Sequence, residues 1–162
     1  MNWQEYYMRH AYLAADKSKD PKTKIGAVLV KDNRLISSGF NGFPYGVKDT
    51  ADRYEDRELK HKLVVHAEAN AVLQGALMGH STHESTLYTP GIPCCECMKS
   101  VIQGGIVKIV VHKQWPNLTH SPKWMESFKI AEMMMRESGI TLDYFDGKLG
   151  LVGLLDGKEI HI

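Results

Sequence analysis

The sequence predicts an α/β protein: a three-layer α/β/α sandwich in which helices cover both faces of a central, mixed, five-stranded sheet. Three observations favour this architecture. Short β-branched runs alternate with segments of helical periodicity along the 162 residues, turn residues separate most of them, and no repeat or low-complexity segment interrupts the order. We therefore expect residues 1–162 to form a single domain, with a core over about residues 2–145 and a C-terminal extension over residues 146–162.

The first forty residues predict a helix followed by a β-hairpin. Asn2 and Glu5 have the spacing of a capping box, and aromatic and apolar residues then recur at helical spacing until the helix ends before Asp20-Pro21. A β-branched run at residues 25–30 and an alternating run at residues 35–40 flank a polar turn, which is typical of two paired strands.

The rest of the chain alternates helices and strands. Helical segments carry apolar residues on one face, strands are short apolar runs, and Gly or Pro marks most of the ends. The elements expected in order are a turn at residues 41–46, a charged and solvated stretch at 49–62, a helix at 64–78, a strand at 85–89, a helix at 93–104, a strand at 106–111, a helix from about 122 to 139, a strand at 140–144 and a small hairpin within 149–162.

Charge and cysteine usage restrict the kind of function. The chain has 20 Lys and Arg against 19 Asp and Glu, a net charge of +1. This balance disfavours a binder of duplex nucleic acid but allows a small anionic ligand. The three cysteines, at positions 94, 95 and 97, lie too close together to form a disulfide framework. No signal peptide or long apolar run is visible, so we expect no membrane span and a cytoplasmic location.

The strongest chemical signal is a set of metal-ligating residues at two expected helix starts. A catalytic zinc ion needs three protein ligands and one open position, and His66, Cys94 and Cys97 supply three. The two cysteines are three residues apart, so one helical turn brings both sulfurs to the same side. Free N–H groups and the dipole at a helix N-terminus stabilise thiolates. We therefore expect one Zn²⁺ ion per subunit.

Glu68 follows the presumed ligand His66 by two residues and need not bind the metal itself. Zinc lowers the pKa of a bound water to about 7, and an adjacent carboxylate can accept the released proton and deliver it to a substrate. The combination of His-x-Glu with Pro-Cys-x-x-Cys is the signature of the zinc deaminases, in which this Glu is the proton shuttle.

With these motifs the chain resembles the cytidine and deoxycytidylate deaminase superfamily, and most of all its deoxycytidylate (dCMP) deaminases. The resemblance covers most of the chain, and its most specific runs are Asp20–Val28, Gly39–Gly46, His66–Ala71 and Cys97–Ile106. It implies the cytidine deaminase-like fold and a hydrolase acting on a cyclic amidine. The implied reaction is the zinc-dependent conversion of dCMP to dUMP and ammonia, which supplies dUMP for dTMP synthesis.

Position by position, the resemblance implies that His66, Cys94 and Cys97 are the zinc ligands and that Glu68 is the proton shuttle. It also implies substrate contacts: the side chain of Asn41 toward the sugar, the backbone of Ala67 against the base, and a basic residue toward the phosphate. The candidates for this last role are Lys22, Lys24, His112 and Lys113.

The resemblance further implies a homo-oligomer, either a hexamer or a dimer, with a small nucleotide as its partner and neither duplex nucleic acid nor a membrane. In the family the loop at residues 39–46 is tied to the effectors dCTP and dTTP. Phe40 in this loop stands where the family commonly has Tyr.

These residues are also compatible with three other functions. Cys94 and Cys97 could form a redox Cys-x-x-Cys pair, although His66-Ala67-Glu68 upstream favours zinc. The enzyme could deaminate another cytosine nucleoside or nucleotide, or tRNA adenosine, although the low net charge disfavours tRNA. Outside enzymes, the chain could be an inactive zinc-binding module, which the presence of Glu68 disfavours. The histidines other than His66 are expected at the surface.

Overall fold

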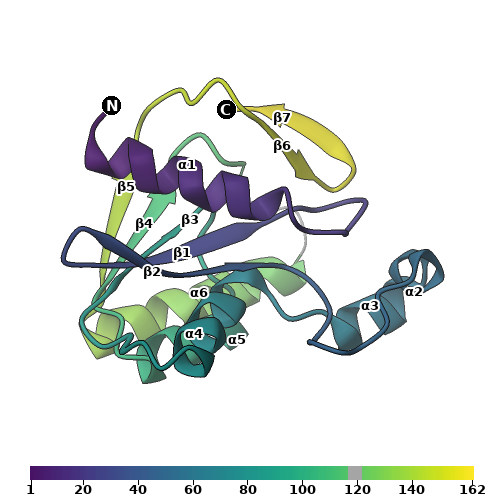
Figure 1. Cartoon of the computed structure of the whole chain (residues 1–162), viewed down its shortest axis with the longest axis horizontal. Coiled ribbons are helices and arrows are strands. Elements are labelled where there is room, and N and C mark those ends of the chain that lie inside the picture. Colours follow the sequence, from purple (N-terminus) through teal and green to yellow (C-terminus); the bar gives the residue numbers. More distant parts are fainter. Residues whose placement is uncertain (117–121) are drawn as a thin grey trace.

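The computed structural model describes residues 1–116 and 122–162 and contains a central five-stranded sheet. The order of its strands is β2-β1-β3-β4-β5. In Figure 1, α1 covers one face of this sheet and α4, α5 and α6 cover the other, so the predicted three-layer α/β/α sandwich is confirmed. The strands are β1 (Gly26–Lys31), β2 (Arg34–Phe40), β3 (Thr86–Thr89), β4 (Lys108–His112) and β5 (Thr141–Phe145).

The sheet is mixed because its two halves are connected differently. β1 pairs antiparallel with both β2 and β3, whereas β3, β4 and β5 are parallel to one another. The predicted β1–β2 hairpin is confirmed, and its turn residues Asp32 and Asn33 have φ values of 49° and 55°. Parallel strands need crossover connections, and helices α5 and α6 provide them here.

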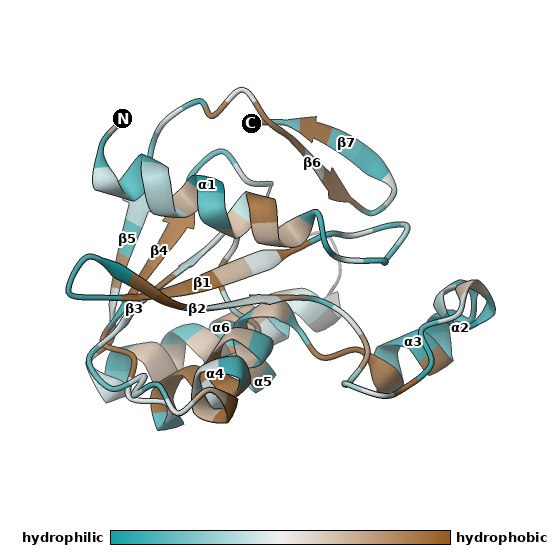
Figure 2. Cartoon of the chain, viewed as in Figure 1, coloured by the Kyte–Doolittle hydropathy of each residue, from teal (hydrophilic) through white to brown (hydrophobic). Residues whose placement is uncertain are grey.

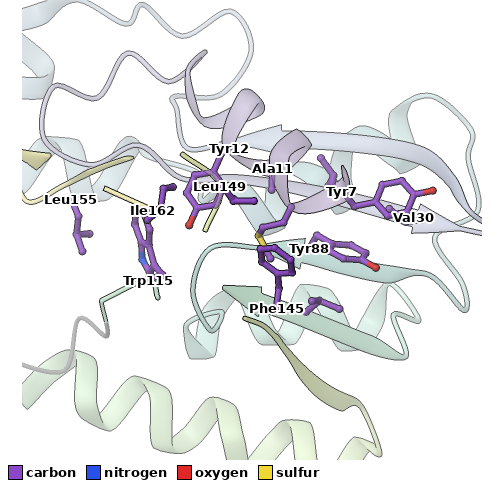
Figure 3. Close-up of a cluster of buried hydrophobic side chains, with 13 residues drawn as sticks. Tyr7, Ala11, Tyr12, Val30, Tyr88, Trp115, Phe145, Leu149, Leu155 and Ile162 are labelled. Carbon is purple, nitrogen blue, oxygen red and sulfur yellow. The ribbon is translucent and has the colours of Figure 1, made fainter. Parts of the chain in front are cut away.

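The helix α1 (Trp3–Ala15) begins where the capping pattern predicts. The side chain of Asn2 accepts a hydrogen bond from the backbone N–H of Glu5 at 2.8 Å. The helix buries Tyr7, Met8 and Ala11 against the sheet, and these side chains belong to an apolar cluster that continues to Tyr88 and beyond (Figure 3).

A second apolar cluster fills the space between the sheet and the three helices of the opposite layer. These helices are α4 (Ala67–Leu77), α5 (Cys95–Gln103) and α6 (Pro122–Ser138). The strands supply both clusters because successive side chains of a strand point to opposite faces: Leu87 lies in this cluster and Tyr88 in the other. Figure 2 accordingly shows the middle of β4 as strongly hydrophobic.

The charged stretch at residues 49–62 is mostly exposed, as expected, but it also forms two short helices that the sequence did not predict, α2 (Ala51–Glu55) and α3 (Arg57–Leu63). Asp56 caps α3 by accepting a hydrogen bond from the backbone N–H of Leu59 at 3.0 Å. The ring of Tyr54 stacks on Phe43, with the ring centres 4.4 Å apart. These contacts stabilise helices that are too short to persist alone.

The predicted C-terminal hairpin is confirmed. It consists of β6 (Val152–Leu155) and β7 (Lys158–His161), with Asp156 and Gly157 in the turn at φ values of 50° and 75°. The hairpin lies beside α1, outside the central sheet (Figure 1). Within the described parts of the chain, no helix is long and apolar enough to cross a membrane.

Candidate functional site

Two helix starts bring the predicted metal ligands together. His66 and Cys94 are the N-cap residues of α4 and α5, both in extended backbone conformation, and neither side chain makes a capping hydrogen bond. Their side chains are therefore free to face each other. Cys97 follows in the first turn of α5, where it is buried.

The donor atoms of His66, Cys94 and Cys97 lie within 4.8 Å of one another. The Sγ atom of Cys94 is 3.4 Å from Nδ1 of His66. Tetrahedral zinc with ordinary bond lengths places such a sulfur and nitrogen about 3.6 Å apart. The three side chains therefore fit one zinc ion and leave its fourth position open. All three cysteines are free thiols.

The electrostatics of these three residues favour a thiolate. Hydrogen bonds from Cys97 and His66 lower the pKa of Cys94 to about 4. The hydrogen bond to Cys94 raises the pKa of His66 to about 9, and the neighbouring Cys94 raises the pKa of Cys97. The lowered pKa of Cys94 favours its thiolate, which is the form that a metal requires.

Glu68 lies in the first turn of α4 beside this donor set, and its side chain is only 6% exposed. Burial raises the pKa of its carboxyl group, with the neighbouring His66 acting in the opposite direction. A buried carboxyl group with a raised pKa, close to an open metal position, is suited to accept and return a proton.

A cavity of about 540 Å³ opens onto these residues, and Glu68, His66 and Cys94 line it. One face of α3 forms part of its wall. Three residues of α3 and its C-cap residue line the cavity, at spacings of three, one and three positions: Arg57, Lys60, His61 and Val64. This spacing is that of a single helical face.

A buried ion pair holds α3 against the segment of residues 20–25, which forms the adjoining wall. The Nζ atom of Lys60 lies 2.9 Å from Oδ2 of Asp20, and the two side chains are 11% and 4% exposed. Asp20 also accepts hydrogen bonds from the backbone N–H groups of Lys22 and Thr23 at 2.9 and 3.1 Å. Asp20 therefore fixes both walls at once.

Asn41 lines the cavity from the loop after β2. Its Oδ1 atom accepts a hydrogen bond from the backbone N–H of Ile25 at 2.8 Å, and its Nδ2 atom donates to the carbonyl oxygen of Thr23 at 2.8 Å. One N–H and one lone pair of the amide are left for a ligand. Ala67 is fully buried and also lines the cavity.

The predicted basic contacts are only partly brought to this cavity. Lys22 lines it, whereas Lys24 lies beside a smaller cavity against β6. Thr23 and Ile25 face the main cavity, and in extended backbone the residue between them points the other way.

Two further basic candidates are engaged elsewhere. Lys113 pairs with Asp146 at 2.6 Å. His112 is buried, with Tyr12 and the carbonyl of Gly147 each 2.8 Å from its ring nitrogens, so the expectation that it lies at the surface was wrong.

An aromatic wall was not foreseen from the sequence. Trp124 and Phe128 of α6 line the cavity, with their ring centres 6.1 Å apart, and the Trp124 ring lies 6.3 Å from that of His66. Their spacing of four residues is indistinguishable in sequence from a helical core stripe. Flat aromatic faces are suited to pack against a planar ring.

Comparison with known proteins agrees with this geometry. The family model described as the cytidine and deoxycytidylate deaminase zinc-binding region matches residues 1–113. An uncharacterized deaminase of Aliivibrio fischeri is 33% identical over 142 residues, which are 88% of this chain and 92% of that protein. The deoxycytidylate deaminase of Mus musculus is 31% identical over 171 residues, covering 99% and 89% of the two chains.

A similar fold occurs in the crystal structure of dCMP deaminase from the cyanophage S-TIM5. It superimposes with a TM-score of 0.67 at 25% identity, covering 88% of this chain and 96% of that chain. The matched family region contains His66, Glu68, Cys94 and Cys97. The prediction of a zinc cofactor is confirmed by this family match together with the position of the three donors.

Proposed function

The chain belongs to the cytidine and deoxycytidylate deaminase family, and on that premise we propose that it converts dCMP to dUMP and ammonia, which supplies dUMP for dTMP synthesis. The observation that carries the proposal is the buried Glu68 carboxyl group beside a three-donor metal set, in the lining of one cavity. A purely structural zinc site usually has four protein ligands and needs no such carboxyl group.

The chemistry divides between the metal and Glu68. A zinc ion held by His66, Cys94 and Cys97 supplies the Lewis acidity that activates water at neutral pH. Glu68 accepts a proton from the attacking water and passes it to N3 of the cytosine ring while the water oxygen bonds to C4. Glu68 then delivers the second proton of that water to the amino group, which leaves as ammonia while a carbonyl remains at C4.

Cations at the cavity wall support a phosphorylated substrate. Lys60 is neutralised by Asp20, but Lys22 and Arg57 also line the cavity. Within residues 1–116 and 122–162, neither of these two side chains forms an ion pair. We assign the 5′-phosphate to Lys22 and Arg57, in place of Lys24, because a phosphate prefers such donors.

The remaining contacts follow from the cavity lining. The free N–H of the Asn41 amide is assigned to the sugar, and the backbone of Ala67 to the base. Trp124 and Phe128 provide aromatic faces on the side of His66, against which the planar base can pack.

The test is an ammonia-release assay on purified zinc-loaded protein with dCMP, deoxycytidine, cytosine and tRNA as parallel substrates. We expect dCMP to have the highest kcat/KM. Faster turnover of deoxycytidine or tRNA would move the substrate assignment to another base carrier. Full zinc content with no ammonia from any substrate would instead indicate an inactive zinc-binding module.

Assembly, regulation and location are proposed in addition. We propose a homo-oligomer, hexamer or dimer, whose contacts use apolar side chains exposed on α4 and at its C-cap, namely Leu73, Leu77 and Met78. Light scattering during gel filtration measures its size. We also propose dCTP and dTTP as effectors, which kinetic assays with each nucleotide added will test, and a cytoplasmic location.

A further inference from the structure

The backbone of residues 22–25, one wall of the cavity, is fixed on both sides although it lies outside the central sheet. On the inner side, Asp20 accepts hydrogen bonds from the N–H groups of Lys22 and Thr23, and Asn41 binds the carbonyl of Thr23 and the N–H of Ile25. These bonds leave the carbonyl of Lys22 and the N–H of Lys24 to be satisfied from the outer side.

The C-terminal hairpin satisfies them. The backbone N–H of Gly157 donates to the carbonyl oxygen of Lys22 at 2.7 Å, and the N–H of Lys24 donates to the carbonyl of Leu154 at 2.9 Å. The N–H of Asp156 donates to the hydroxyl oxygen of Thr23 at 3.1 Å. Leu154 of β6 and the two turn residues Asp156 and Gly157 are therefore hydrogen-bonded to residues 22–24 of the cavity wall.

The same hairpin also supports a second wall of the cavity. The Trp115 side chain lines the cavity and is only 6% exposed. Gly153 of β6 lies so close to it that a Cβ atom there would be 2.7 Å from the Trp115 ring. Leu155 and Ile162 anchor the hairpin in the apolar cluster that also contains Trp115 (Figure 3).

From these contacts we propose that the C-terminal hairpin is a positioning element of the substrate cavity: its turn holds residues 22–24 and its strand β6 seats Trp115. The hairpin contributes none of the metal donors and does not contain Glu68, so it sets nucleotide affinity and leaves the chemical step unchanged. It lies outside residues 1–113, the part that the family model matches. The proposal rests on the proposed function, because it assumes that the nucleotide binds in this cavity.

The experiment uses two turns of the same kind in one chain. Asp156 in the C-terminal hairpin and Asp32 in the β1–β2 hairpin have φ values of 50° and 49°. Proline cannot adopt this conformation and has no N–H, so Asp156→Pro and Asp32→Pro distort their turns in the same way. Asp156 itself lines the cavity and Asp32 does not, so Gly153→Ala, which keeps the Asp156 side chain, is the variant that separates support by the hairpin from a direct contact of Asp156 with the nucleotide.

For Asp156→Pro we expect KM for dCMP and the Kd for dUMP, measured by calorimetry, to rise about fivefold or more, the effect of losing one or two hydrogen bonds. Its kcat should stay within about twofold and its zinc content should be unchanged. Asp32→Pro should lower thermal stability but leave KM and Kd at the parent values. Gly153→Ala, which displaces Trp115, should raise KM as Asp156→Pro does and keeps the test decisive if Asp156→Pro does not fold.

Two results would overturn the proposal. One is an equal change of KM in Asp156→Pro and Asp32→Pro, which would indicate general destabilisation. The other is parent-like KM and Kd in both Asp156→Pro and Gly153→Ala. Failure of the proposed function has a different signature, since the parent enzyme would then neither release ammonia from dCMP nor bind dUMP.

Discussion

Replacing Lys60 by Met should destabilise the protein far more than the same change two residues later. Lys60→Met leaves the carboxylate of Asp20, which is 4% exposed, without its cation. Removing one partner of a buried ion pair costs about 3–5 kcal/mol. Asp20 keeps two backbone N–H donors, so we expect the lower end of this range, about 3 kcal/mol.

Lys62→Met is the matched control, since Lys62 lies on the same helix and is paired with Glu58 at 2.7 Å. These two side chains are 68% and 82% exposed, and exposed pairs of this spacing contribute about 0.5 kcal/mol or less. Urea unfolding followed by circular dichroism measures both variants.

A double variant completes the experiment. Asp20→Asn combined with Lys60→Met removes both charges, so its cost should be smaller than the sum of the two single changes by about 1–3 kcal/mol. Equal destabilisation by Lys60→Met and Lys62→Met, or strict additivity in the double variant, would refute the role of the pair in joining α3 to the cavity wall.

Further predictions concern the chemistry, the substrate and the pH dependence. Glu68→Gln should retain zinc, as measured by atomic absorption, but lose about 10²–10⁴-fold in kcat for ammonia release; parent-like turnover would remove Glu68 from the mechanism. Arg57→Ala should raise KM for dCMP about tenfold and leave deoxycytidine turnover unchanged; an equal effect on both substrates would contradict a phosphate contact. Chelation of zinc should lower the melting temperature and added zinc should restore it; an unchanged melting temperature would show that the ion does not support the fold. Burial lowers the pKa of His112. At pH values between this lowered pKa and the ordinary pKa of about 6.5, the unfolded chain therefore binds more protons than the folded protein. The free energy of unfolding should therefore fall as the pH drops below about 6.5, and this slope should be smaller in His112→Gln; an identical slope in both proteins would contradict a neutral buried imidazole.

The positions of the three metal donors and of Glu68 were predictable because their arrangement is encoded locally. Cys94 and Cys97 are one helical turn apart, and His66 lies two residues before Glu68. Once the start of a helix is known, the positions of both residues of a pair follow. Pro93 and the apolar periodicity of α4 indicate where the two helices start. The layer order of the fold followed in the same way from alternating local patterns.

The cavity walls were not predictable because distant contacts form them. Helices α2 and α3 have no apolar face of their own in the sequence and depend on the Phe43–Tyr54 stack and the Asp20–Lys60 pair. Whether Lys22 or Lys24 faces the cavity depends on the phase of one extended segment, which the bonds to Asn41 and the C-terminal hairpin determine. His112 is buried because β4 lies between β3 and β5 in the sheet and the rings of Tyr12 and Phe145 pack against the imidazole.

The peripheral position of α2 and α3 has an evolutionary consequence. The two helices project beyond the sandwich (Figure 1), yet they line the same cavity as His66, Glu68 and Cys94. Residues 51–63 thus form a cavity wall that contributes no strand to the sheet and no metal donor. Selection can therefore change which nucleotide the cavity binds while the metal donors and Glu68 stay in place. Related enzymes on this scaffold can then differ in substrate before they differ in reaction chemistry.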